Sequence, residues 1–311
     1  MKTKLREVLR LLRPRQWLKN FAVFGAITFS GELFNIPILV DVILGFIVFC
    51  AISSGIYVIN DIFDIEKDKL HPFKKFRPLP SGKISLKEAK LIALTLCVGT
   101  LFASYFLTPS FFLITVIYLI LNVAYSSVLK NIEIIDILAI AGGYILRVYA
   151  GEFVSGFHIS VWLLLTTISL SLFLAIGKRR SELTLISQHT SAQIAATRKT
   201  LSHYSERLLD VYASIFATST FISYALFTFL SNSNNQITNT ILLPDFFPEY
   251  LQRKWLMITI APVVYGLMRY LQDIYERHEG ESPERVIFSD KALLASVIIW
   301  VVLVITITYF I

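Results

Sequence analysis

Three aspartates at the end of an apolar run carry the clearest chemical signal in this chain. They lie in Asn60-Asp61-Ile62-Phe63-Asp64-Ile65-Glu66-Lys67-Asp68, directly after the apolar run Val42–Ile59. In a continuous helix, Asp61, Asp64 and Asp68 fall within an arc of about 60° on one face, and Glu66 points nearly the opposite way. Stacked carboxylates repel one another unless a cation lies between them. Because Mg²⁺ binds a few carboxylates together with substrate phosphates, the spacing predicts a magnesium site; a solvated acidic helix end is the alternative.

A basic loop follows the aspartates, with the sequence His71-Pro72-Phe73-Lys74-Lys75-Phe76-Arg77-Pro78-Leu79-Pro80-Ser81-Gly82-Lys83. Its prolines and glycine end the helix and predict an ordered loop or short re-entrant turn. A metal neutralises only part of a phosphate group, and Lys or Arg can hold the remainder. We therefore expect Lys74, Lys75 and Arg77 to bind phosphate. A positively charged loop without a ligand is the alternative for each of them.

A second polar group contains Tyr125, Lys130, Asp136 and Arg147. Asp136 and Arg147 face the same side of one expected helix, but about 16 Å along its axis separates them, which argues against direct contact. An arginine inside a membrane span should face the bundle interior or a wet cavity. We expect the two side chains to border a polar cavity at different depths, although a structural internal pair is an alternative.

Two more basic clusters lie at expected membrane boundaries. Gly177-Lys178-Arg179-Arg180-Ser181-Glu182 closes one span, and Arg13-Pro14-Arg15-Gln16-Trp17-Leu18-Lys19-Asn20 begins another. We expect Lys19 and Asn20 to reach the same cavity mouth. Lys178, Arg179 and Arg180 are either anion-binding residues or interface anchors. The histidines have no zinc-type spacing, and no Ser–His–Asp set is recognisable.

The elements that position these residues are membrane-spanning helices. The chain has 311 residues, is 55% hydrophobic and only 16% charged, unlike a soluble globular domain. Measured against the roughly 20 residues that a span needs, the apolar runs predict an all-α bundle of about nine spans within one membrane-embedded domain, residues 1–311. The expected spans are Trp17–Ser30, Pro37–Ile59, Ala89–Leu107, Ser110–Ser127, Ile134–Phe153, Ser160–Ile176, Leu208–Leu230, Trp255–Leu271 and Ala292–Ile311.

Charge patterning predicts the orientation of these spans. Every second connection is rich in Lys and Arg, and the intervening ones are nearly bare of them. By the positive-inside rule, the amino terminus lies in the cytoplasm and the carboxyl terminus outside. The net charge of +7 is spread over these loops, which indicates topology and phosphate binding rather than nucleic acid. Cys50 and Cys97 fall within apolar spans and imply no disulfide framework.

Taken in order, the clusters resemble the UbiA-type membrane prenyltransferase superfamily. Asn60-Asp61-x-x-Asp64-x-x-x-Asp68 matches its first aspartate motif in full. Further patches are similar to the decaprenyl-phosphate phosphoribosyltransferase branch: Arg13-Pro14-Arg15-Gln16-Trp17-x-Lys19-Asn20, Asp68-x-x-His71-Pro72-x-Lys74-x-x-Arg77-Pro78, Tyr125-Ser126-x-x-Leu129-Lys130, Asp136-Ile137, Gly143-x-x-Leu146-Arg147-x-x-Ala150-Gly151, Leu172-Phe173-Leu174-Ala175-x-Gly177-Lys178-Arg179-Arg180-x-Glu182, Arg269-Tyr270-Leu271 and Pro283-Glu284. The resemblance covers nearly the whole chain.

This resemblance implies Mg²⁺-dependent transfer of 5-phosphoribose from phosphoribosyl pyrophosphate to a polyprenyl phosphate such as decaprenyl phosphate, for cell-envelope glycan precursors. It implies Asp61, Asp64, Asp68 and Arg77 as catalytic residues, with the three aspartates on the metal. It implies a plasma (inner) membrane enzyme whose site faces the cytoplasm, and it hints at self-association. The substrate-binding candidates are Lys19, Asn60, Lys74, Lys75, Tyr125, Lys130, Asp136, Arg147, Lys178, Arg179 and Arg180.

One departure from the broad superfamily bears on the substrate. Where a second aspartate-rich motif would hold more Mg²⁺ on a prenyl diphosphate, this chain offers only Glu133-x-x-Asp136, with Lys130 and Arg147 nearby. Fewer anions and more cations suit a polyprenyl monophosphate. Two alternatives stay open: a prenyltransferase joining a prenyl diphosphate to a quinone precursor or other acceptor, and a transporter of a phospholipid or small anion.

Overall fold

The computed structural model describes residues 2–70, 74–187, 204–231, 254–276 and 283–310. Throughout these ranges the regular structure is helical. The helices and 3₁₀ segments are α1 Lys2–Leu12, η1 Pro14–Phe24, α2 Gly25–Phe29, α3 Ile36–Phe63, α4 Ile65–Leu70, η2 Lys74–Phe76, α5 Leu86–Leu107, α6 Pro109–Ser127, η3 Leu129–Asn131, α7 Ile135–Ser155, α8 Val161–Ser187, α10 Glu206–Leu230, η5 Trp255–Thr259, α12 Ile260–Tyr275, α13 Pro283–Ser289 and α14 Lys291–Phe310.

Seven of the helices in the described ranges are long and apolar enough to cross a membrane: α3, α5, α6, α7, α8, α10 and α14. The protein is therefore a multi-pass membrane protein, as its composition predicts. The other two expected spans correspond to broken segments. The first contains the 11-residue 3₁₀ helix η1 followed by α2, and the eighth contains η5 followed by α12. The count of nine is accordingly approximate.

Local sequence signals set several helix starts. Ser85 and Glu88 form a reciprocal capping box at the start of α5. Thr108 caps α6, with Pro109 as its first residue, and Ser205 caps α10 through the Leu208 amide. These caps satisfy amide groups that would otherwise lie unpaired at the ends of the spans.

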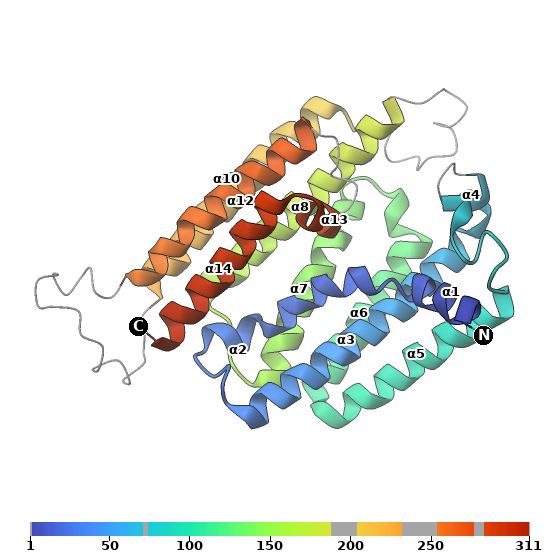
Figure 1. Ribbon diagram of the computed structural model, residues 1–311, viewed down its shortest axis with the longest axis horizontal. Coiled ribbons are helices and arrows are strands. Elements are labelled where there is room, and N and C mark those ends of the chain that lie inside the picture. Colours follow the sequence, from blue (N-terminus) through green and yellow to red (C-terminus); the bar gives the residue numbers. More distant parts are fainter. Residues whose placement is uncertain (1, 71–73, 188–203, 232–253, 277–282, 311) are drawn as a thin grey trace, which may run out of the picture.

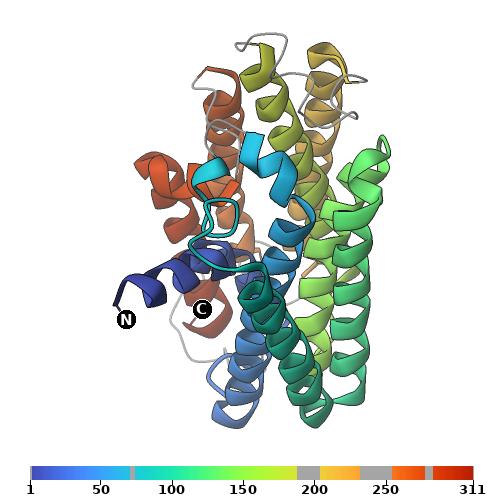
Figure 2. The ribbon, with the colours of Figure 1, turned by 90° about the vertical axis from the view of Figure 1, so that its right-hand side faces the viewer.

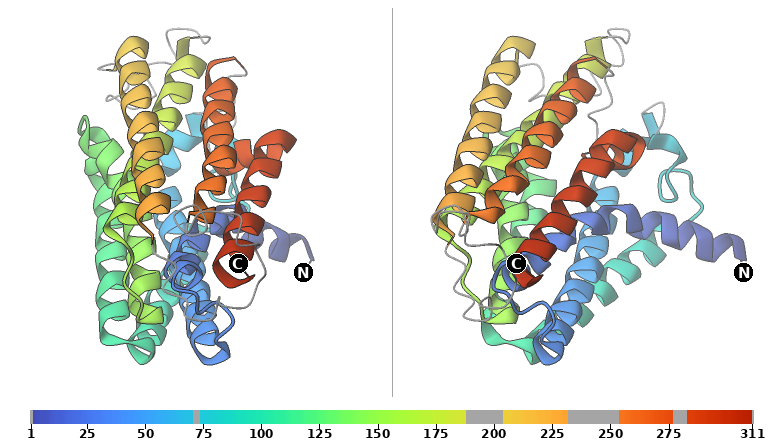
Figure 3. Two further views of the ribbon diagram at one scale, coloured as in Figure 1. Left: turned by 90° about the vertical axis from the view of Figure 1, so that its left-hand side faces the viewer. Right: turned by 60° about the vertical axis from the view of Figure 1, so that its left-hand side comes forward.

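The bundle is divided into two groups of helices (Figure 1). Helices α3, α5, α6 and α7 form one group, and α8, α10, α12 and α14 form the other, with α7 and α8 in contact between them. Figure 2 shows α4 and the end of α8 at the same end of the bundle. Helix α1 extends sideways from the bundle (Figure 3). The residues that could do chemistry come from several segments that meet at the α4 end.

The first span approaches α7 very closely. A Cβ atom added to Gly151 would lie 2.0 Å from the Val23 carbonyl oxygen, so this position accepts only glycine while η1 keeps its place. Arg13, just before η1, has left-handed backbone angles (φ 52°, ψ 61°) and turns the chain from α1 into η1. Lys19 and Asn20 are thereby brought into the interior beside α3 and α7.

Candidate active site

The three aspartates occupy a break in the helix rather than one continuous face. Helix α3 ends at Phe63, Asp64 has φ −97° and ψ 4°, and α4 begins at Ile65. The Asp64 amide still donates to the Asn60 carbonyl (3.0 Å) and the Asp68 amide to the Asp64 carbonyl (2.8 Å), so the helical spacing is nearly kept. Glu66 pairs with Lys69 and is exposed, on the far side as predicted. The expected single face is therefore opened at Asp64.

Arg77 joins the two outer aspartates. One of its guanidinium nitrogens lies 2.6 Å from Asp68 Oδ2 and 3.3 Å from Asp61 Oδ1. Asp61 also accepts a hydrogen bond from Arg13, whose guanidinium stacks 5.1 Å above the ring of Tyr57. Both carboxylates are almost completely buried, whereas the Arg77 and Arg13 side chains are 28% and 22% exposed. The cations thus cover the carboxylates from the solvent side.

Asp64 has a different partner. Its Oδ1 lies 2.6 Å from the Nζ atom of Lys130, a residue of η3 between α6 and α7. The Lys130 side chain is 5% exposed, although it comes from a loop. The pair fastens the α6–α7 connection to the end of α3. Lys130 therefore belongs to the aspartate group, and not to the group of Tyr125, Asp136 and Arg147 in which its sequence position placed it.

Within the described ranges, no three His, Cys, Asp or Glu side chains converge in a ready-made metal site. The donor set nevertheless fits Mg²⁺, a hard cation that prefers carboxylate oxygens and phosphate. The nitrogen of Arg77 lies between oxygens of Asp61 and Asp68, so the geometry already places a cation between these two carboxylates. Asp61, Asp64 and Asp68 are the residues that would hold the ion, with Arg77 moving toward the solvent side.

Asp136 is enclosed by a separate set of partners. Its Oδ2 forms an ion pair with Nε of Arg179 at 2.6 Å, a contact not aligned as a hydrogen bond, and the two side chains are 0% and 1% exposed. Arg179 also reaches Glu182 (2.5 Å) and the Tyr125 hydroxyl (2.9 Å). Buried charges are tolerated when they are paired in this way. Tyr125, Asp136 and Arg179 consequently join the ends of α6, α7 and α8.

Tyr204 is a member of this group that sequence reasoning did not identify. Its hydroxyl donates to Asp136 Oδ1 (2.9 Å) and accepts a hydrogen bond from the amide of Ile134 (2.6 Å). Ile134 caps α7 with a positive φ of 64°, which is unusual for a β-branched residue. Burial, together with the nearby Asp136 carboxylate, raises the pKa of Tyr204 to about 12, so the hydroxyl stays protonated as a donor. No spacing rule in the sequence links Tyr204 to Asp136.

Arg147 lies in a deeper polar layer with neutral partners. Its guanidinium donates to Asn20 Oδ1 (2.7 Å), the Gly143 carbonyl (2.6 Å) and the Tyr118 hydroxyl (2.5 Å). It also stacks on the rings of Tyr118 and Tyr144. Arg147 and Asp136 have separate partners at different depths, as their spacing predicts. The bond to Asn20 fixes η1 against α7 and so positions Lys19.

The three basic residues near the end of α8 point in different directions. Helix α8 continues to Ser187, beyond the expected end of the span at Ile176, so these residues lie on helical turns. Arg180 pairs with Glu206 (3.0 Å) and Asp210 (2.8 Å) of α10 and stacks on Tyr275. The structure therefore does not bring Arg180 to the other site candidates, because helical rotation turns it toward α10.

Lys178 faces the opposite way from Arg180. It is half-buried, and its electrostatic neighbours are Glu182, Tyr125, Arg179 and Lys19. Lys19 of η1 donates to the Gln16 side chain at 2.8 Å, and Gln16 in turn accepts from the Tyr57 hydroxyl. Lys178 and Lys19 thus border the interior beside Arg179.

The remaining candidates lie at the edge of the aspartate group. Asn60 is half-buried one position before Asp61, and Lys74 is half-buried in η2. Lys75 is exposed and stacks on the ring of Phe76. Residues 71–73, which include His71 of the sequence motif, lie outside the described ranges. The loop that carries Arg77 is ordered as predicted, with Leu79 and Ile84 buried against Leu11 and Val58.

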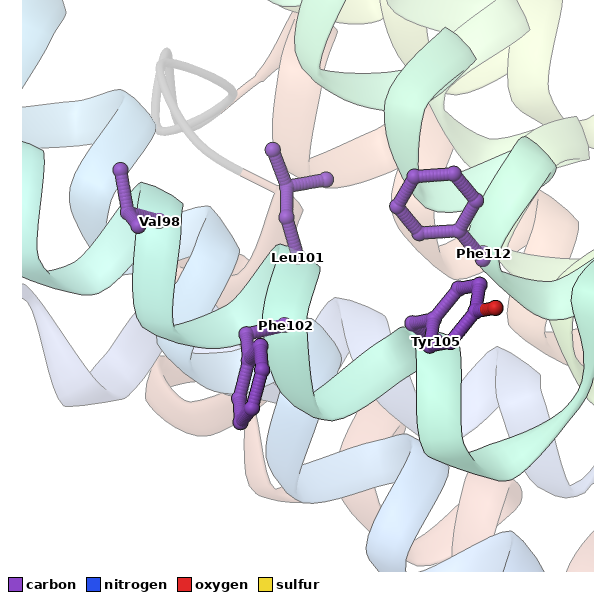
Figure 4. Close-up of a pocket in the computed structure, with 5 residues that line it drawn as sticks. All are labelled: Val98, Leu101, Phe102, Tyr105 and Phe112. Atoms are coloured by element: carbon purple, nitrogen blue, oxygen red, sulfur yellow. The ribbon is translucent and has the colours of Figure 1, made fainter.

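An apolar groove on the bundle surface is unrelated to this site. It is lined by Val98, Leu101, Phe102 and Tyr105 of α5 and Phe112 of α6, as Figure 4 shows. These residues lie toward the α5–α6 turn, away from the α5 start, where Lys4 pairs with Glu88. No acid, base or charged group lines the groove, so it has no means of doing the chemistry predicted from the sequence.

Comparison with known proteins gives the same family as the sequence motifs. Residues 20–289 match the UbiA prenyltransferase family. The decaprenyl-phosphate phosphoribosyltransferase of Corynebacterium glutamicum is 32% identical over 97% of this chain and 86% of its own length. The enzyme of the same name from Mycolicibacterium smegmatis is 32% identical over 94% of this chain and 90% of its own length.

Solved structures share the fold. A UbiA homologue from Archaeoglobus fulgidus, bound to GPP and Mg²⁺, superimposes with a TM-score of 0.68 at 18% identity and covers 97% of this chain and 99% of its own. A digeranylgeranylglyceryl phosphate synthase structure gives a TM-score of 0.62 at 20% identity, covering 98% of this chain and 100% of its own. Because the family match spans most of the sequence and the relatives are similar over nearly their full length, the chain belongs to the UbiA prenyltransferase family.

Proposed function

We propose that this protein transfers 5-phosphoribose from phosphoribosyl pyrophosphate to a polyprenyl phosphate, with decaprenyl phosphate as the model acceptor, and releases diphosphate. Relatives that are about one-third identical over nearly the whole chain bear the name decaprenyl-phosphate phosphoribosyltransferase. Their name supports the reaction, and the arrangement of charges supports the pair of substrates.

The state of Asp136 is the observation that carries this proposal. Its carboxylate is enclosed by Arg179, Tyr204 and its own helix amide, with no exposed surface. The site therefore offers one group of carboxylates, Asp61, Asp64 and Asp68, of which the outer two lie beneath partly exposed arginines, and a second region dominated by cations. One metal-bound diphosphate and one monophosphate suit this division better than a prenyl diphosphate shared between two carboxylate groups.

The reaction needs little acid–base chemistry. An oxygen of the acceptor phosphate attacks C1 of the ribose, the bond from C1 to the diphosphate oxygen breaks, and the diphosphate leaves with the electron pair. The acceptor is already an anion, so no side chain has to remove a proton from it. The protein must hold two anionic substrates close together in the right orientation. Arg77, Arg13 and Lys74 border the aspartates and would neutralise the leaving diphosphate.

Mg²⁺ on Asp61, Asp64 and Asp68 would act as a Lewis acid and template for the leaving diphosphate. Lys130 would keep Asp64 in place from the inner side, because its ammonium group is buried against that carboxylate. Asp61 and Asp68 would be released from Arg77, whose partly exposed side chain is able to turn toward the substrate.

The setting of the enzyme is also part of the proposal. We place it in the plasma (inner) membrane as one membrane-embedded domain with the amino terminus and the active site on the cytoplasmic side. The excess of Lys and Arg at the α4 end supports this orientation. Phosphoribosyl pyrophosphate is a soluble, charged donor, which a site open to the cytoplasm can receive. Self-association stays a prediction from the family resemblance.

The decisive experiment uses purified protein with labelled phosphoribosyl pyrophosphate and a polyprenyl phosphate. We expect Mg²⁺-dependent formation of a phosphoribosylated lipid without any ion gradient. Activity only with a prenyl diphosphate and an aromatic acceptor would overturn the proposal in favour of ordinary prenyl transfer. Gradient-dependent movement of a phosphorylated lipid without turnover would indicate a transporter.

A further inference from the structure

Helix α1 is amphipathic along its length. At 100° per residue, Leu5 and Leu9 share one face, and Glu7 lies on the opposite face. Leu5 and Leu9 are 64% and 48% exposed, although both are large apolar side chains. The helix also contains four basic residues and one acidic residue. An exposed apolar face beside a basic polar face is typical of helices that lie in the surface of a bilayer.

The remaining apolar side chains fix α1 at the ends of two membrane spans. Leu11 is completely buried in a cluster that contains Val58 of α3 and Ala89 of α5. Val58 lies near the end of α3, and Ala89 lies in the first turn of α5. Because both helices are membrane spans, α1 lies at a boundary of the bilayer. Its first turns reach outward from the bundle, as Figure 3 shows.

An ion pair shows which face of α1 is turned away from the bilayer. The Glu7 carboxylate lies 3.2 Å from Nζ of Lys83, which belongs to the polar loop before α5. Leu5 and Leu9, on the opposite face, are therefore directed toward the bilayer. Arg6 lies between these two faces, where the headgroups of the lipids would be. Its side chain is exposed and forms no hydrogen bond or ion pair with the described residues.

The position of α1 also bears on the active site, because the chain runs from this helix directly into it. Arg13, the residue that follows α1, donates a hydrogen bond to Asp61. Leu11 packs in the same cluster as Leu79, which belongs to the loop that carries Arg77. A helix that is anchored in the bilayer would hold both of these segments against the aspartates.

We propose that α1 is an interfacial helix, with Leu5 and Leu9 inserted in the bilayer and Arg6 bound to the headgroups of anionic phospholipids. Its anchoring steadies the segments that carry Arg13 and Arg77. A guanidinium suits this role, because it can donate two parallel hydrogen bonds to one phosphate. The basic charge of the helix complements an anionic bilayer surface, which attracts Lys and Arg at the membrane edge.

The test measures amide hydrogen exchange of α1 in the full-length protein. The protein is reconstituted as single copies in lipid nanodiscs of phosphatidylcholine, either alone or mixed with phosphatidylglycerol. We expect α1 to exchange about fivefold more slowly in the anionic discs, the factor for one basic residue at such a surface. Arg6→Gln should abolish this difference. Arg207→Gln is the matched control, because Arg207 is an exposed arginine on α10, and this variant should behave as wild type does.

Two further measurements test the apolar face and the link to the active site. Leu5→Gln should speed the exchange of α1 by about tenfold in both kinds of disc, because a leucine side chain no longer enters the bilayer. Glutamine is nearly as good a helix former as leucine, so the variant keeps the helix propensity of the segment. Residues 77–84 should also exchange more slowly in the anionic discs, because they pack on α1.

Each contrary result overturns a stated part of the proposal. Equal exchange of wild-type α1 in the two kinds of disc, or equal effects of Arg6→Gln and Arg207→Gln, would overturn the assignment to anionic lipid. Wild-type exchange in Leu5→Gln would show that the apolar face stays outside the bilayer. Protection of α1 only in discs with two copies would indicate that a second copy of the chain covers this face.

The link to the active site can fail separately. If α1 depends on anionic lipid but residues 77–84 exchange equally in both kinds of disc, the helix binds lipid and the link is wrong. All of these measurements are made without substrate. Failure of the proposed phosphoribosyl transfer would therefore leave the result for α1 unchanged.

Discussion

The ammonium group of Lys130 lies 2.6 Å from the Asp64 carboxylate, which joins two residues 66 positions apart. This contact ties η3, between α6 and α7, to the end of α3. The outer aspartates, Asp61 and Asp68, are instead joined through Arg77. The aspartate motif is thus held on two sides by cations from different parts of the chain.

The aspartate group provides the first prediction. Asp61→Asn or Asp64→Asn should lower Mg²⁺-dependent phosphoribosyl transfer by about 100-fold or more, because each change removes a carboxylate from the metal and its diphosphate. Glu66→Gln is the matched control, since Glu66 is exposed and pairs only with Lys69 among the described residues. Steady-state rates and thermal unfolding of each variant are measured together. Equal loss in Glu66→Gln and Asp64→Asn would show that the assignment of faces is wrong.

Arg77 provides the second prediction. Its guanidinium contacts Asp61 and Asp68 and would turn to the diphosphate when the substrate binds. Arg77→Gln should raise the KM for phosphoribosyl pyrophosphate by about tenfold or more, with little change in the acceptor KM. Lys69→Gln also removes one positive charge, but from an exposed side chain of α4. It should leave the KM values for both substrates near those of wild type. A shift in the acceptor KM alone would assign Arg77 to the other substrate.

Arg147 provides the third prediction, which concerns stability. Arg147→Met removes the donor to Asn20, Gly143 and Tyr118 inside the membrane-embedded layer. Among the described residues, the Asn20 Oδ1 atom and the Tyr118 hydroxyl would keep only their contacts with Ser53, and losing a hydrogen bond from a charged donor costs about 1.5–3 kcal/mol, so the unfolding temperature in detergent or lipid should fall clearly. Transfer activity should fall as well, because Asn20 would no longer hold η1 and Lys19 in place. An unchanged unfolding temperature with lost activity would indicate that Arg147 contacts substrate directly.

Tyr204 provides the fourth prediction. Tyr204→Phe removes the hydroxyl that accepts from the Ile134 amide and donates to Asp136. We expect destabilisation of about 1–3 kcal/mol, because a buried amide and a buried carboxylate both lose a partner. Tyr212→Phe is the control, since Tyr212 is half-buried on α10 and its hydroxyl makes no hydrogen bond to the described residues. Denaturation curves of the three proteins compare the effects, and identical curves would remove Tyr204 from the network.

Asp290 provides the fifth prediction, a pH dependence. The hydrogen bond from Arg269 holds the pKa of the Asp290 carboxyl well below its usual range, and amides at the start of α14 act in the same direction. A depressed folded-state pKa stabilises the protein above the unfolded value of about 3.9 and loses this effect as the pH falls toward the folded value. Wild type should therefore lose more unfolding free energy than Asp290→Asn as the pH falls from 6 to 3, and this difference should have the same sign in any detergent. Parallel thermal unfolding across this pH range checks it, and equal slopes would contradict it.

Local sequence determined the class of this protein and the identity of its main motif. Long apolar runs must become helices in a bilayer, because only hydrogen-bonded backbone is tolerated there. The spacing of Asp61, Asp64 and Asp68 is a local property, and it placed Asp61 and Asp68 within reach of one Arg77 guanidinium nitrogen even though the helix breaks at Asp64. The opposite direction of Glu66 followed from the same helical repeat.

Tertiary structure decided which charges meet. Lys178, Arg179 and Arg180 are adjacent in sequence, yet one is directed inward, one is buried against Asp136, and one is bound by α10. Helical rotation separates adjacent residues by about 100°, but only the packing of neighbouring helices decides what each of them faces. Tyr204 could not be found from the sequence for the same reason. Its hydroxyl reaches Asp136 across 68 positions, and a contact at that separation depends on how the helices pack rather than on any local pattern.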